Sequence, residues 1–256
     1  MGEIGRRTLE LWSDRSMPGS ERHQLGGWVL RADRGATGRA NSVWPTGKPD
    51  RPVGAAVDAA ERWYADRGRR TMFQLFDGVD PDLGAELDHR GYLEVPGALV
   101  MVAPIAAPEA ETAVAAPAVP APAGAGGVEV RCATSPSPAF ATLVDDDDRL
   151  AEMASAGLVQ RYVTAHASGG SVLGGGLGTL DGDGFGVFAM RTVEAARRRG
   201  VATLVLAELR RAGHELGAST LWLQVMADNT AARALYRREG LEVVHGYRYR
   251  ASPPGS

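Results

Sequence analysis

The stretch EAARRRGVATLVLAELRRAG at residues 194–213 combines three arginines, a glycine and a segment with apolar residues at helical spacing. The first backbone N–H groups of a helix have no internal acceptor and carry a partial positive charge, so they can bind an anion. Gly200 and the small Ala202 would let a phosphate approach these groups, and the arginines would pair with its oxygens. The stretch therefore predicts a phosphate-binding helix N-terminus.

The composition and the absence of two common phosphate-binding motifs limit which ligands this site could bind. The chain lacks GxGxxG and GxxxxGK[ST], which mark dinucleotide and nucleoside triphosphate sites. Nucleic-acid binding through residues 197–199 with Arg210 and Arg211 is an alternative interpretation. The formal net charge of -3 argues against it, because the chain has no general basic field.

Two segments resemble the signatures of the GNAT superfamily of N-acetyltransferases. RRRGVA is similar to the family's [RQ]xxGx[GA] loop, and NTAARALYRREGL is similar to its NxxAxxLYxxxGF segment. The matching residues are Arg197, Gly200, Ala202, Asn229, Ala232, Leu235, Tyr236 and Gly240, with Leu241 at the usual phenylalanine. The resemblance covers roughly residues 158–250.

The resemblance implies an enzyme that moves an acetyl or related acyl group from acetyl-coenzyme A (acetyl-CoA) to an amine of a small molecule. Its pantetheine arm would lie where two central parallel strands splay apart, and a backbone N–H near Thr192 or Val193 would polarise the thioester carbonyl. The residues that the resemblance implies for coenzyme binding are Met190, Thr192, Val193, Arg197, Arg198, Arg199, Gly200, Val201, Ala202, Thr203 and Asn229.

The catalytic residue that the resemblance implies is Tyr236, as the acid that protonates the departing thiolate. A phenol with a pKa of about 10 can protonate a thiolate whose pKa is about 8.5 and stay neutral at pH 7. No motif names a general base, and Tyr162, His166 and Asp183 are candidates only by region. Because the attacking amine must be neutral, we expect activity to rise with pH.

Helical and strand-like segments alternate in the second half of the chain. Periodicity and turn residues predict helices at 140–156, 201–213 and 229–239, and strands at 158–167, 171–180, 185–193, 219–226 and 241–250. The acidic run at 145–148 is expected to form a solvated face within the first helix. Interleaved strands and helices predict an α/β fold.

An Ala/Pro/Gly-rich segment divides the chain. PIAAPEAETAVAAPAVPAPAGAGG predicts a linker at 104–127, between units at 1–103 and 128–256. Gly68 and Gly91 are twenty-three residues apart, as are Gly217 and Gly240, which suggests an internal duplication. We therefore expect two GNAT-like mixed-sheet α/β units joined by this linker.

The first unit is expected to be a degenerate copy without catalysis of its own. The shared glycine spacing places Leu87 at the position of Tyr236 and Asp80 at that of Asn229. The segment GWVLRADRGATGRANSVWP is dense in polar and aromatic residues, and one hypothesis makes it a wall of the acceptor pocket. The substrate residues of that hypothesis are Asn41, Ser42 and Trp44, and the alternative is ordinary packing and turn capping.

The whole sequence also bears on disulfides, metal sites, membrane spans and partners. One cysteine in 256 residues excludes an internal disulfide, no metal is expected, and no apolar run approaches the ~20 residues of a membrane span. We expect a cytoplasmic monomer or homodimer with no nucleic-acid or membrane partner. A non-catalytic acyl-CoA sensor and an acyltransferase whose donor is an acyl carrier protein remain alternatives.

Overall fold

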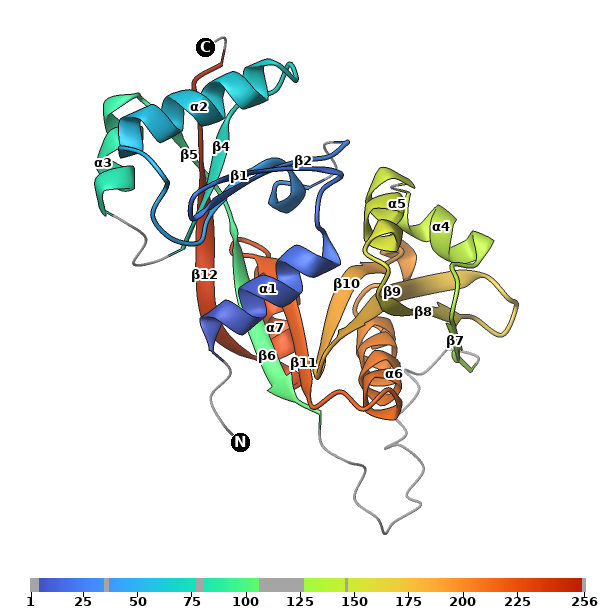
Figure 1. The fold of residues 1–256 in the computed structure, drawn as a ribbon. Coiled ribbons are helices and arrows are strands. Elements are labelled where there is room, and N and C mark those ends of the chain that lie inside the picture. Colours follow the sequence, from blue (N-terminus) through green and yellow to red (C-terminus); the bar gives the residue numbers. More distant parts are fainter. Residues whose placement is uncertain (1–4, 35–36, 77–80, 106–126, 146, 255–256) are drawn as a thin grey trace.

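The computed structural model describes residues 5–34, 37–76, 81–105, 127–145 and 147–254. The fold is mixed α/β, built on a twelve-stranded sheet with strand order β1-β2-β3-β4-β12-β6-β11-β10-β9-β8-β7, and β5 also pairs with β12 (Figure 1). The α/β class expected from the sequence is thereby confirmed. Among these residues, no helix is long and apolar enough to cross a membrane.

The elements of the first part of the chain are α1 (Arg6–Ser16), β1 (Glu21–Leu25), β2 (Trp28–Ala32), η1 (Arg39–Asn41), β3 (Val43–Pro45), α2 (Val53–Ala65), β4 (Met72–Phe76), α3 (Pro81–His89), β5 (Leu93–Val95) and β6 (Ala98–Pro104). Those of the second part are β7 (Glu129–Ala133), α4 (Pro138–Val144), α5 (Asp147–Ser155), β8 (Val159–His166), β9 (Val172–Asp181), β10 (Gly184–Thr192), η2 (Glu194–Ala196), α6 (Val201–Glu215), β11 (Thr220–Met226), α7 (Thr230–Arg238) and β12 (Glu242–Ala251).

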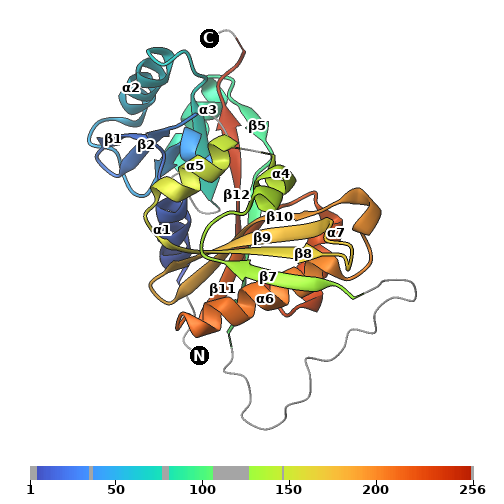
Figure 2. The ribbon, with the colours of Figure 1, turned by 90° about the vertical axis from the view of Figure 1, so that its right-hand side faces the viewer.

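The segment 140–156 forms two helices, so the prediction of one helix is wrong. Asp145 ends α4 with φ +48°, a left-handed conformation that Asp tolerates better than most residues, and its N–H donates to Ala141 O. The acidic run therefore begins in the break between the helices. α4 and α5 cover one face of strands β8–β10, and α6 covers the other (Figure 2).

Strands pair across the predicted boundary between the two units. β6 lies between β11 and the first half of β12, in register with Thr220↔Pro104 and Glu242↔Val102. The second half of β12 lies between β4 and β5. Each unit's sheet is thus completed by a strand that follows the other unit's last helix.

The predicted linker lies mostly outside the described residues, which leave out 106–126. Its first two residues belong to the packed structure: Pro104 ends β6, and the buried Ile105 donates its N–H to Ser219 O at 2.8 Å. The division of the chain at this segment remains a prediction.

Corresponding elements recur in both units. The shift in numbering that takes Gly68 to Gly217 and Gly91 to Gly240 also takes α3 onto α7, and α2 onto residues within α6. All four glycines have positive φ and follow the C-termini of these helices. The N–H of Tyr92 reaches Leu87 O at 2.9 Å, as that of Leu241 reaches Tyr236 O at 2.9 Å. This correspondence is what an internal duplication predicts.

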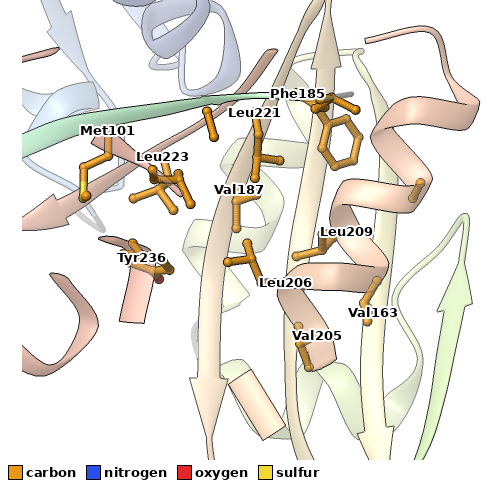
Figure 3. Close-up of a cluster of buried hydrophobic side chains, with 14 of the residues drawn as sticks. Met101, Val163, Phe185, Val187, Val205, Leu206, Leu209, Leu221, Leu223 and Tyr236 are labelled. Carbon is orange, nitrogen blue, oxygen red and sulfur yellow. The ribbon is translucent and has the colours of Figure 1, made fainter. Parts of the chain in front are cut away.

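The apolar face of α6 packs on the sheet of the second unit. Val205, Leu206 and Leu209 lie against Phe185 and neighbouring strand residues, with Tyr236 at the edge of the same cluster (Figure 3). This packing fixes the position of the N-terminus of α6 relative to strand β10.

Candidate active site

Strands β10 and β11 separate at the centre of the sheet. They pair in parallel only from Gly184↔Thr220 to Val187↔Leu223, although β10 continues to Thr192 and β11 to Met226. On the other side of β10 the register with β9 shifts between Phe188 and Arg191, and Ala189 has φ +49°. A bulge bends a strand and leaves a residue unpaired, so this one opens the sheet beside β11. The splay expected from the resemblance is present.

The N-terminus of α6 has the geometry of an anion site. Gly200 is the N-cap residue with φ +77° and ψ 0°, a conformation that favours glycine. The first helical hydrogen bond runs from Leu204 N–H to Gly200 O at 3.1 Å. The N–H groups of Val201, Ala202 and Thr203 therefore precede the helical ladder and have no intrahelical acceptor.

A cavity of about 630 Å³, here called the helix groove, runs from this N-terminus to α7. Its lining includes Met190, Thr192, Arg197, Arg198, Gly200, Val201, Ala202, Thr203 and Asn229, all expected coenzyme residues. The rest of the lining is Arg238, Leu235, Arg191 and four alanines, of which only Leu235 and Ala232 belong to the second signature. The spacing of the first signature identified the residues of the loop before α6. The other residues of the groove lie on elements that only the fold brings together.

Two expected coenzyme residues lie outside the lining of the groove. The N–H of Val193 donates to Leu173 O at 3.0 Å, so it has no free donor for a thioester carbonyl. The side chain of Val193 packs against the core, and Arg199 is exposed at the surface. Thr192, the other suggested donor, lies opposite Gly174 of β9. Because hydrogen-bonded and non-hydrogen-bonded pairs alternate along an antiparallel ladder and Val193 bonds to Leu173, the N–H of Thr192 is directed away from β9.

A second cavity, of about 230 Å³, occupies the opening between β10 and β11 and is called the central cleft. Its lining is Arg39, Arg149, Val187, Phe188, Ala189, Met190, Arg191, Gln224, Val225, Met226, Asn229, Ala232 and Tyr236. Met190, Arg191, Asn229 and Ala232 also line the helix groove, so the two cavities adjoin. A ligand whose phosphates lie at α6 can therefore extend into the cleft.

Tyr236 lines the central cleft from α7. The residue is 7% exposed, and burial raises the pKa of its phenol above the ordinary value. The first turn of α7 is fixed by Asn229, whose side chain accepts a hydrogen bond from Ala232 N–H at 3.1 Å. Asn229 thus caps the helix that carries Tyr236 and also borders both cavities.

The lining of the central cleft is electropositive. Among the residues that the structure describes, it contains three arginines, Arg39, Arg149 and Arg191, and no Asp or Glu. At the groove, Arg238 donates to Thr203 Oγ1 at 3.3 Å, and Thr203 donates to Glu239 at 3.2 Å. Arg238 also forms an ion pair with Glu239 at 3.6 Å, so Arg191, Arg197 and Arg198 supply the positive charge of the groove lining.

The three candidate general bases line neither cavity. Tyr162 donates to Gln160 and packs edge-on against Phe140. The ring nitrogens of His166 contact Thr164 and Gly170. Asp183 accepts hydrogen bonds from Ser219 at the far end of β10. None of the three is placed to accept a proton in the central cleft.

The residues suggested for the acceptor wall have partners within the first unit. The buried Ser42 accepts hydrogen bonds from Arg31, through both its hydroxyl and its carbonyl oxygen. Trp44 is buried beneath the guanidinium groups of Arg7 and Arg31. The side chain of Asn41 holds the turn before η1. These contacts match the packing and capping alternative.

The first unit does reach the central cleft, through a residue that the sequence analysis missed. Arg39 stands two positions before Asn41 and lines the cleft beside Phe188. The quoted segment contains several arginines, and no sequence signal separates a buried arginine from an exposed one.

The comparisons with known proteins agree with this geometry. The family model described as "Probable histone acetyltransferase Rv0428c C-terminal" matches residues 3–250. The uncharacterized N-acetyltransferase YobR of Bacillus subtilis (strain 168) is 24% identical over 253 residues, 95% of this chain and 97% of the relative.

Solved structures share the fold. A GCN5-related N-acetyltransferase from Kribbella flavida is similar with a TM-score of 0.71 and 18% identity, covering 100% of this chain and 98% of that one. A tandem GNAT protein from the clavulanic acid biosynthesis pathway is similar with a TM-score of 0.63 and 14% identity, covering 97% and 89%.

Proposed function

The chain belongs to the acetyltransferase family whose model spans residues 3–250, and from that premise we propose that it transfers an acetyl group from acetyl-CoA to the amine of a small molecule. It is a GNAT-type N-acetyltransferase. One observation supports the finer proposal most strongly: the anion-binding N-terminus of α6 and the phenol of Tyr236 border two cavities that share a wall.

The helix groove suits the coenzyme. The N–H groups of Val201, Ala202 and Thr203 would bind its diphosphate, with Arg197 and Arg198 neutralising the charge. The pantetheine arm would follow the splayed end of β10 past Thr192 and Met190, which brings the thioester to the central cleft.

The chemistry is a direct transfer. The neutral amine attacks the thioester carbonyl carbon, the C–N bond forms, and the C–S bond breaks with the electron pair on sulfur. Tyr236 gives its proton to the thiolate, and the proton lost by the amine nitrogen restores the phenol, so protons balance. Ala189 and Met190 have no register partner on β9 or β11, and their N–H groups replace that of Val193 and join that of Thr192 as proposed donors to the carbonyl oxygen.

The acceptor is proposed to be a small molecule because of charge. The family description names histones, whose tails are polycationic. The described lining of the cleft has three arginines and no carboxylate, so it repels such a chain and offers a second ammonium group no partner among these residues.

The test is thiol release from acetyl-CoA by the purified full-length chain across a panel of small amines and a histone-tail peptide. We expect turnover with at least one small amine and none with the peptide. Coenzyme binding without turnover on any amine would favour the sensor alternative. Turnover only with an acyl carrier protein as donor would favour the carrier alternative.

A further inference from the structure

Arg39 lines the central cleft and is a buried cation with a donor that has no partner among the described residues. Its side chain comes from η1 of the first unit, and the residue is 8% exposed. Among the described residues, Nη1 of Arg39 has no hydrogen-bond partner, and no carboxylate lies within ion-pair distance of the guanidinium. The guanidinium lies over the Phe188 ring, 5.7 Å from its centroid.

This arrangement is costly without an anionic ligand. Arginine stays charged at every physiological pH, and a buried charge without a partner is destabilising. The ring face of Phe188 compensates only partly, because a cation–π contact is weaker than a charge-assisted hydrogen bond. The unused donor therefore points to a group that arrives with the substrate.

Hydrogen bonds and close packing fix the backbone around Arg39. The side chain of Asn41 accepts from Asp33 N–H at 2.9 Å and donates to Thr37 O at 2.8 Å, which holds the turn that precedes η1. A Cβ added to Gly38 would lie 2.9 Å from the Tyr249 ring, so this turn is packed closely against β12. These contacts fix the backbone next to Arg39, and the ring of Phe188 lies beneath its guanidinium.

We propose that Arg39 binds a carboxylate of the substrate in the central cleft, and that the acceptor is therefore an amine that also carries a carboxylate. Arginine and carboxylate pair through two parallel hydrogen bonds, which would satisfy Nη1 and orient the amine. Arg149 and Arg191 add positive charge to the same lining, whose described residues include no Asp or Glu. This inference rests on the proposed function and specifies its acceptor.

The carboxylate that pairs with Arg39 could also belong to the donor, at the far end of its acyl group. The experiment separates the two with matched pairs. In one arm, amino acids are compared with their carboxamides as acceptors, with acetyl-CoA as donor. In the other, succinyl-CoA is compared with acetyl-CoA, with a fixed neutral amine as acceptor.

The variants are Arg39→Met, Arg39→Lys and the matched control Arg34→Met. Arg34 lies in the same turn region, is exposed and pairs with Asp148, and it does not line the cleft. We expect Arg39→Met to lower kcat/KM for the amino acid by about 10- to 100-fold, mostly through KM, and to change that for the carboxamide by less than about threefold. Arg39→Lys should recover part of the loss, and Arg34→Met should behave like the wild type.

Binding is measured separately by titrating the amino acid into enzyme saturated with coenzyme A. Binding that is lost in Arg39→Met supports the carboxylate site even if no turnover is found, in which case only the proposed function fails. An equal loss for both acceptors, or no discrimination between them, overturns the inference. A preference for succinyl-CoA that disappears in Arg39→Met overturns the acceptor assignment and places the carboxylate on the donor.

Discussion

Tyr236 is the residue on which the proposed chemistry depends. Its phenol is buried among apolar side chains of the core cluster and borders the central cleft. Burial disfavours the phenolate and so raises the pKa, which keeps the proton in place throughout the pH range in which amines become neutral.

We predict that Tyr236→Phe lowers kcat by about 10²-fold, at the low end of the effect of a general acid, with little change in the Kd of coenzyme A. For the wild type, kcat/KM should rise with pH as the amine loses its proton. Because the phenol's pKa lies above its ordinary value of about 10, loss of the acid should not lower the rate below pH 10. An unchanged kcat in the variant, or a wild-type rate that falls between pH 8 and 9, would contradict this role.

Gly200 gives a second test at the residue scale. Gly200→Ala should weaken coenzyme A binding by about tenfold, because a side chain at this N-cap hinders the approach of the diphosphate to the amides. The matched control is Gly217→Ala, which has φ +83° and open space around an added Cβ at the other end of α6. Both variants should lose about 1–2 kcal/mol of unfolding free energy, and only the first should lose affinity in calorimetry. Equal affinities would refute the groove as the coenzyme site.

At the scale of elements, α7 must be held firmly for Tyr236 to point into the cleft. Asn229 begins this helix and also borders both cavities. Capping and ligand binding by this one side chain can be separated by substitution.

We predict that Asn229→Ala costs about 1 kcal/mol in the free energy of unfolding, because the cap to Ala232 N–H is lost. Asn229→Ser keeps a capping oxygen and should restore stability in denaturant unfolding. If Asn229 acts only through the cap, the serine variant also restores coenzyme affinity. A stable serine variant with weak binding would show that the amide contacts the coenzyme directly.

Most elements of the second unit could be predicted from the sequence. The apolar spacing of α6, the alternation in β11 and the glycines after both helices are local signals, and the structure contains these elements within a residue or two of the expected bounds. The break at Asp145 was missed, because its cause is a left-handed conformation rather than a change in periodicity.

The candidate site could be predicted only where its residues lie close together in the sequence. The residues around Gly200 follow one another in sequence, so their spacing revealed them. Arg39 and Gln224 come from different units, and they meet in the cleft only through the packing of the whole sheet. Long-range strand pairing leaves no periodic trace in either partner strand, so the exchange of β6 and β12 was also missed.

At the scale of the whole molecule, the two predicted units share one sheet. β6 is hydrogen-bonded on both sides by strands of the second unit, and β12 reaches β4 and β5 of the first. α1 adds to this interface: Trp12 stacks on Trp222 with ring centroids 6.3 Å apart, and Gln224 donates to Ser13 at 2.8 Å.

We predict that cutting the chain within residues 106–126, at an introduced protease site, leaves the two fragments associated and active. The exchanged strands, rather than the covalent connection, hold the units together. Gel filtration after cleavage should give one peak at the position of the intact protein, and heating should give one cooperative transition. Separate fragments, or two independent transitions, would contradict the strand exchange.

The central claim is that the N-terminus of α6 binds the coenzyme diphosphate and directs the thioester to Tyr236. A crystal structure of the acetyl-CoA complex measures this directly. The account predicts diphosphate oxygens about 3 Å from the N–H groups of Val201, Ala202 and Thr203, with the thioester sulfur in the central cleft beside the Tyr236 hydroxyl. A diphosphate bound away from α6, or a thioester outside the cleft, would contradict it.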